Sequence, residues 1–218
     1  MKTDAEIRND IFSELKWEPS VRDTEIGVAV KDGVATLSGN VTTFAQKFAA
    51  DHAAERVVGV RAVADEITVK LPSTYERSDT EIAHAIANVL KWDTEVPDEK
   101  VKARVDKGWI WLEGDVEWQF QKQAAERAIR YLSGVKGVTN TIRVKPKLAS
   151  PFEVSQKIKQ ALLRGEQFDA QRIVVEAQDG KITLRGTVRS YAERKEAERA
   201  AWSAPGVTEV EDKIAIGI

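Results

Sequence analysis

The sequence contains no cysteine, and this absence excludes disulfide bonds, thiolate metal ligands and cysteine nucleophiles. Methionine occurs only as Met1. No apolar run approaches the roughly 18 residues that a membrane-spanning helix needs, and the first residues turn acidic at once and lack the apolar core of a signal peptide. We therefore expect a cytoplasmic protein, or a periplasmic one if a leader has been removed.

An excess of one charge is also missing. The chain has 33 Lys and Arg against 35 Asp and Glu, which gives a formal net charge of −2. Proteins that coat nucleic acid or attach to membranes through polybasic segments carry a clear positive excess. Hydrophobic residues make up 42% of the chain, as is typical of a soluble globular protein.

An internal repeat is the strongest feature that the sequence does contain. Gly39 and Gly114 are separated by 75 positions, and Gly114 and Gly186 by 72, and each glycine follows a leucine by two positions. The same two shifts align turn glycines six residues earlier and Gly-Val pairs 20 residues later. The glycines of these pairs are Gly59, Gly134 and Gly206. The chain is therefore predicted to consist of three tandem modules, at residues 1–71, 78–146 and 151–218 (modules 1, 2 and 3).

The order of elements within a module follows from its hydrophobic periods. Ile7, Ile11 and Leu15 recur at helical spacing, with Asp4 at the expected N-cap, as Asp79 is in module 2. Two strands with alternating apolar residues follow, joined by two-residue turns such as Asp32-Gly33, which favour a type I′ hairpin.

An alanine-rich second helix and a last strand complete the module. Because a helix joins the second strand to the third, these two strands must run parallel. We predict an α+β fold of three α-β-β-α-β modules, each a three-stranded mixed sheet with two helices on one face.

This element order, the central glycines and the late Gly-Val pairs resemble the BON domain, the bacterial osmotically inducible and nodulation domain. The resemblance covers nearly the whole chain three times. It implies a bacterial, non-enzymatic protein related to osmotic stress or to the envelope. It also implies anionic phospholipid as a ligand, and one cytosolic relative binds potassium.

Side chains that bear chemistry are scattered. His52 and His84 occupy non-equivalent places in different modules, and we interpret both as surface helix residues. The glycines are isolated and do not form a phosphate cradle. We predict no catalytic residues, no metal site and no cofactor.

The outer sheet face of module 2 is the candidate contact surface. If Ile110 and Leu112 point toward the helices, Trp109 and Trp111 point to the opposite face, with Arg104 directly across from Trp111. The complete set is Trp109, Trp111, Lys102, Arg104, Arg143 and Lys145. Trp17 and Trp92, at the ends of the first helices, are expected to serve core or hinge packing.

Several occupants suit this face. It can pack on another module or another copy of the protein, bind an anionic phospholipid headgroup layer, or stack single-stranded nucleic acid. Nucleic acid is not expected, because module 2 is not basic overall. The leading hypothesis is a stress-related protein that binds anionic phospholipid. The alternatives are potassium sensing through backbone carbonyls and a self-assembling or chaperone-like scaffold.

Overall fold

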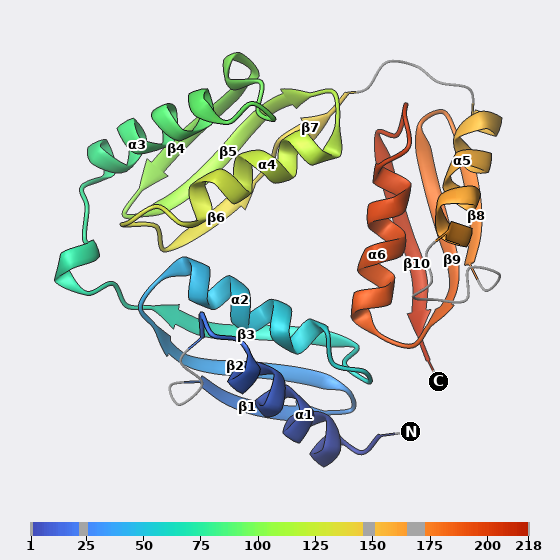
Figure 1. Cartoon of the computed structure of the whole chain (residues 1–218), viewed down its shortest axis with the longest axis horizontal. Helices are drawn as coiled ribbons and strands as arrows, with labels where there is room; N and C mark the ends of the chain where they lie inside the picture. Colours follow the sequence, from blue (N-terminus) through green and yellow to red (C-terminus); the bar gives the residue numbers. More distant parts are fainter. Residues whose placement is uncertain (1, 22–25, 146–150, 165–172, 218) are drawn as a thin grey trace.

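The computed structural model describes residues 2–21, 26–145, 151–164 and 173–217 and contains three similar units (Figure 1). Module 1 consists of α1 (Asp4–Trp17), β1 (Ile26–Lys31), β2 (Val34–Val41), α2 (Phe44–Glu55) and β3 (Ala62–Val69). Module 2 consists of α3 (Asp79–Trp92), β4 (Val101–Asp106), β5 (Trp109–Val116), α4 (Gln119–Arg130), β6 (Gly137–Asn140) and β7 (Arg143–Val144). Module 3 consists of α5 (Pro151–Arg164), β8 (Ile173–Gln178), β9 (Lys181–Val188), α6 (Tyr191–Trp202) and β10 (Glu209–Ile216). Short 3-10 turns at Ser73–Tyr75 and Asp98–Lys100 precede α3 and β4.

The sheets have the mixed topology that the sequence predicts. In each module the middle strand pairs antiparallel with the first strand and parallel with the last. Both helices lie on one face, so the α+β architecture of three tandem modules is confirmed (Figure 1).

Each module has a core of its own between helices and sheet. The middle strand supplies side chains with no exposed surface, and the first helix supplies one residue per turn. In module 2 these are Ile110 and Leu112 from β5 and Ile82, Ile86 and Leu90 from α3. Three separate cores agree with the three repeats.

The hairpin turns have the predicted left-handed backbone. Asp32, Lys107 and Asp179 have φ of 52°, 51° and 47°, and the glycine after each also has a positive φ. Lys107 therefore adopts a conformation that costs a non-glycine residue energy. The central glycine is required as well: at Gly114, φ is 144° and a Cβ would collide with the carbonyl oxygen of Lys100.

Asp4 and Asp79 have a different role from the one predicted. The N-caps are Thr3 and Ser78, each in a capping box with Glu6 or Glu81. The two aspartates occupy the first helical position, where each carboxylate reaches the hairpin turn. The backbone N–H groups of Lys107 and Gly108 donate to Asp79 at 2.7 and 2.9 Å, and Asp4 accepts from Asp32 and Gly33 in the same way. Helix start and turn are thereby joined.

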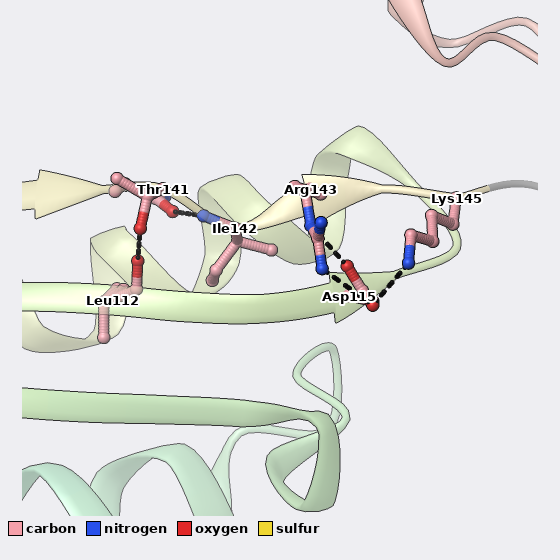
Figure 2. Close-up of polar contacts among 7 residues, drawn as sticks. Leu112, Asp115, Thr141, Ile142, Arg143 and Lys145 are labelled. Carbon is pink, nitrogen blue, oxygen red and sulfur yellow. Dashed lines mark hydrogen bonds and ion pairs between the residues drawn. The ribbon is translucent and has the colours of Figure 1, made fainter.

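The last strand of module 2 is interrupted at Thr141 and Ile142, which separates β6 from β7. The N–H and the hydroxyl of Thr141 both donate to the carbonyl oxygen of Leu112, at 2.8 and 2.7 Å, and Ile142 N–H donates to the Asn140 side chain (Figure 2). Asp65 and Asp212 accept from the equivalent N–H groups in modules 1 and 3. An Asp or Asn at this position therefore shapes the last strand in all three modules.

The second helices α2, α4 and α6 face one another in the middle of the molecule (Figure 1). The guanidinium carbon of Arg130 on α4 lies 3.1 Å from the ring centroid of Phe48 on α2, and Phe44 packs against the core of module 2. In the described part of the chain, no helix is long and apolar enough to cross a membrane.

Replacing Asp79 by Ala tests the clamp between helix start and turn. The variant leaves two turn N–H groups without their charged acceptor, so we expect the free energy of unfolding to fall by about 2 kcal/mol. Urea unfolding measures this change. Glu99→Ala, an exposed residue of the 3-10 turn before β4, is the control and should leave stability unchanged. Equal stability of the two variants would contradict the clamp.

Candidate functional site

The sheet face of module 2 carries its two indoles on the side without helices. Ile110 and Leu112 are fully buried, while Trp109, on the opposite face, is 46% exposed. Arg104 pairs with Trp111 in the sheet register, and its guanidinium carbon lies 4.5 Å from the Trp111 ring centroid. This distance permits a cation–π contact. The structure therefore brings Trp109, Trp111 and Arg104 together as the alternation predicts, while their role in binding stays a prediction.

The Trp109 ring packs against Gly137 on the neighbouring strand. The two residues are partners in the parallel register, and a Cβ on Gly137 would overlap the indole ring. The equivalent pairs are Val34 with Ala62 in module 1 and Lys181 with Glu209 in module 3. The tryptophan and the glycine occur together in module 2, so the absence of a side chain at Gly137 makes room for the Trp109 ring.

Two of the four predicted cations are held by an acid that the sequence reasoning overlooked. Arg143 and Lys145 both bind Asp115, at 2.9 and 2.7 Å (Figure 2). Hydrogen bonds from Lys145 and then Arg143 lower the pKa of Asp115 below its ordinary value. Strand alternation would have identified Asp115, because it lies four residues after Trp111 on the same strand and therefore on the same face.

The remaining cation of the set, Lys102, is exposed at the first strand of the module. Its partner in the register is Glu113, which shares the outer face. The surface is therefore less basic than the four cations alone suggest.

The same face has a different character in the other two modules. In module 3, Lys181 forms ion pairs with Glu209 and Glu211 at 2.9 and 3.3 Å. Hydrogen bonds from Lys213 and then Lys181 lower the pKa of Glu211 to about 2. In module 1 the corresponding positions hold small residues, Val34 and Thr36. Only module 2 presents indoles there.

Trp17 and Trp92 are exposed rather than packed in a core or hinge, which corrects the expectation. Each is the last residue of a first helix, and their exposed fractions are 83% and 84%. Each follows a lysine, Lys16 or Lys91. These positions lie beyond the buried stripe that ends at Leu15 and Leu90, so the ring has no core to enter. The Leu-Lys-Trp pattern in two modules was the available sequence signal.

A groove of about 660 Å³ lies between the second helices of all three modules. Phe48 and His52 come from α2, Lys122 and Arg130 from α4, and Lys195 from α6. No sequence pattern predicts this groove, because it depends on how the modules are placed relative to one another.

A trio of polar residues connects each second helix with the last strand of its module. A cation on the helix, an acid one turn later and an Asp or Asn on the last strand are equivalent in the three modules. The trios are Lys47, Asp51 and Asp65; Lys122, Glu126 and Asn140; and Arg194, Glu198 and Asp212. The cation binds the strand carboxylate at 2.7 Å in module 1 and 2.5 Å in module 3. Module 2 differs, because its strand residue is the neutral Asn140.

The two histidines lie on helices with exposed side chains, as expected. His84 is exposed on α3, and His52 lines the groove 3.3 Å from Glu55. Burial and then the positive charges of Arg130, Lys195 and Arg56 lower the pKa of His52. Within the described ranges, no group of three His, Asp or Glu residues is placed to hold a metal ion.

Comparisons with known proteins find the same repeat. The BON domain family matches residues 3–70, 78–146 and 152–217. Osmotically-inducible protein Y of Escherichia coli is 32% identical over 148 residues, which is 65% of this chain and 73% of that protein.

Solved structures give a weaker likeness. The CdsD protein of Chlamydia trachomatis, a structural protein of the type III secretion system, is 12% identical over 96% of this chain and 91% of that chain, with a TM-score of 0.28. Its C-terminal domain is 11% identical over the full length of both chains, with the same TM-score.

Substituting Gly137 by Ala tests the fit of Trp109. The added methyl group collides with the indole, and we expect a loss of about 1–3 kcal/mol in the free energy of unfolding, as for other overpacked sites. Trp109→Val should restore stability in the Gly137→Ala background, because module 1 carries the pair Val34 and Ala62. A double-mutant cycle by chemical denaturation measures the coupling, and additive effects would refute the contact.

Asp51 gives stability a pH dependence. Burial, and next the charge of Asp65, raises the pKa of Asp51 to about 7, and its Oδ1 is buried without a hydrogen-bond partner. A raised native pKa means that the folded state binds the extra proton. The favourable contribution is therefore complete below the unfolded value of 3.8 and is lost as pH rises through about 7.

We expect Asp51→Asn to remove this loss. At about pH 8 the variant should be about 1–2 kcal/mol more stable than the native chain, after allowance for partial solvent screening, and the gain should vanish near pH 4. Thermal unfolding across this pH range measures it. Glu66→Gln, an exposed neighbour on β3, is the matched control. A gain independent of pH would contradict the role of Asp51.

Proposed function

Because the chain belongs to the BON domain family, we propose that it is an osmotic-stress-related protein that acts by binding an anionic phospholipid surface and not by catalysis. The similarity to osmotically-inducible protein Y supports the relation to osmotic stress. The family also supports the non-catalytic part of the proposal.

The exposure of Trp17 and Trp92 carries the phospholipid part. An indole has a large apolar body and one N–H donor, which suits the boundary between headgroups and acyl chains. The preceding Lys16 and Lys91 place a cation next to each tryptophan in the sequence, where it attracts lipid phosphate. Two such Lys-Trp pairs in one chain strengthen binding through multivalency when both reach the same surface.

The sheet face of module 2 is the second contact in this proposal. Trp109 is half-exposed on the same sheet face as Arg104, which lies over the Trp111 ring, so this face also combines apolar rings with a cation. It sits beside the hairpin turn that Asp79 holds at the start of α3, whereas Trp92 ends that helix. The two surfaces therefore lie at opposite ends of module 2 and are separable by mutation.

The net charge of −2 means that attraction to an anionic surface must be local. At an ionic strength of 0.1 M, charges more than about 10 Å away are largely screened. A cation adjacent to an inserted ring lies within that range, and so does the acid that follows each ring, Glu18 or Asp93. Glu18 is paired with Arg56 at 3.7 Å. Binding should accordingly weaken with salt but not vanish, because the apolar contribution of the rings is not screened.

Flotation with vesicles tests the proposal. We expect the chain to float with phosphatidylglycerol vesicles and less with phosphatidylcholine vesicles. Replacing both Trp17 and Trp92 by Ala should weaken partitioning about tenfold or more, equal to about 1.4 kcal/mol. Trp109→Ala measures the sheet face separately. Equal flotation with the two lipids would overturn the proposal.

Phe152→Ala is the matched control for these variants. Phe152 is 73% exposed at the start of α5, and Pro151 precedes it where the two tryptophans have a lysine. Its removal deletes a similar apolar area from a module without a Lys-Trp pair, so flotation should not change. If Phe152→Ala weakens flotation as much as the double tryptophan variant does, the Lys-Trp pairs have no special role.

Potassium binding and self-association stay predictions.

A further inference from the structure

The groove between the second helices has more cations than carboxylates on its walls. Four carboxylates line it, Glu55, Glu126, Glu196 and Glu198. Six cations line it: Arg56, Lys122, Arg127, Arg130, Lys195 and Arg199. Every module contributes at least one cation. The lining residues alone have a balance of +2, before Glu14 and Glu95 are counted, which pair with Arg56 and Arg127 from outside the groove.

Three of these cations are engaged by acids. Arg56 lies 3.2 Å from Glu14, Arg127 is paired with Glu95, and Arg199 is paired with Glu196. The other three are held more loosely or not at all. Arg130 is 3.4 Å from Glu126, and Lys195 is 3.8 Å from Glu198. Within the described residues, no carboxylate forms an ion pair with Lys122.

Lys122 lacks a strand carboxylate as an ion-pair partner because of a single difference between modules. The equivalent Lys47 and Arg194 each bind an aspartate on the last strand. In module 2 that strand residue is Asn140, whose amide donates to the Lys122 carbonyl oxygen and to Glu126. Burial lowers the pKa of Lys122, because the ammonium has lost water without gaining that partner. Among the described residues, therefore, module 2 is the one whose equivalent cation has no strand carboxylate, and this cation, Lys122, lines the groove with Glu126 as its nearest opposing charge.

Two further polar atoms on the groove wall lack partners. Gln119 Oε1, an acceptor, and Arg130 Nε, a donor, are buried and form no hydrogen bond in the described structure. Leaving such atoms unsatisfied typically costs about 1–3 kcal/mol each. A ligand that satisfies both must offer a donor as well as an acceptor.

His52 reports the electrostatic potential in the groove. The charged groups that act on it are Arg130 from α4, Lys195 from α6, and Arg56 and Glu55 at the end of α2, with Glu126 as the opposing acid on α4. Burial is the first cause of the lowered pKa of His52, and cations from three modules are the second. Three cations thus stand against two acids around one imidazole.

We propose that the groove between α2, α4 and α6 is a binding site for a small oxyanion that also carries a hydrogen-bond donor, such as a phosphate monoester or an amino- or hydroxy-carboxylate. Lys122 and Lys195 bind its charged oxygens. Arg130 Nε donates to it, and its own donor reaches Gln119 Oε1. The volume of about 660 Å³ admits a molecule larger than inorganic phosphate.

Such a ligand is bound by residues of modules 2 and 3, and module 1 closes the groove around it with Phe48 and His52. It therefore binds the arrangement in which the second helices face one another, and by mass action it stabilises that arrangement against any in which they separate. The site does not depend on lipid, and it lies on other residues than the Lys-Trp pairs. Its failure would leave the phospholipid proposal intact, and the reverse also holds.

Imidazole NMR on the full chain tests the site, because the chain has only two histidines. The probes are inorganic phosphate and L-glutamate, with sulfate for comparison, at constant ionic strength and without lipid. We expect phosphate or glutamate to move the titration midpoint of His52 to higher pH and to leave His84 unmoved. Sulfate has the size and charge of phosphate but no donor at neutral pH, and it should bind at least about tenfold more weakly, since one charge-assisted hydrogen bond is lost. No response at His52 to phosphate and glutamate would overturn the site, and equally tight sulfate would overturn the donor requirement.

Two variants separate binding from folding. Asn140→Asp gives Lys122 the strand carboxylate that modules 1 and 3 already have, and it keeps the side-chain oxygen that accepts from Ile142 N–H. We expect it to fold and to weaken the binding of the responding probe about tenfold or more. Lys122→Gln should weaken it similarly. Lys159→Gln, an exposed lysine on α5, is the control. Binding by Asn140→Asp as tight as that of the native chain would refute the proposal.

Discussion

Each module covers only one face of its sheet, and the rest of the structure depends on this constraint. Two helices bury Ile110 and Leu112 and their equivalents completely, so a core forms from about 70 residues, a size at which stability is marginal. The other sheet face and the outer sides of the second helices remain uncovered. Contacts between modules, such as that of Arg130 with Phe48, add stability that each small core lacks. The uncovered surfaces are also where the modules are free to differ.

Periodicity and turn chemistry predicted most of each module. The buried stripe of the first helix, the alternation that placed Trp109 outward and the register that set Arg104 against Trp111 all follow from local spacing. The clamp by Asp79 was missed, because an aspartate at a helix start is ordinarily a cap, and here Ser78 takes that role. The groove was missed for another reason. No hydrophobic period encodes the placement of one module against the next.

The differences between modules are coordinated in space. Trp109 occurs with Gly137 across the strand, and Lys181 in module 3 occurs with Glu209 at the same two positions. Asn140 stands opposite Lys122 where the other modules have an ion pair. Each module thus satisfies its own neighbours while sharing one backbone. A repeat that preserves the fold in this way can assign separate surfaces to separate modules.

The balance between exposed and partly buried charges relates these surfaces to osmotic stress. Exposed pairs such as Arg127 with Glu95 weaken as salt rises, whereas a partly buried ammonium such as Lys122 is screened much less. Rising ionic strength therefore weakens the exposed ion pairs at the rim of the groove before it weakens the electrostatic interactions of Lys122 inside the groove. A bound anion in the groove between the modules counteracts this loosening, and the more so the higher its concentration. Salt and solute then act in opposite directions on the same arrangement of modules.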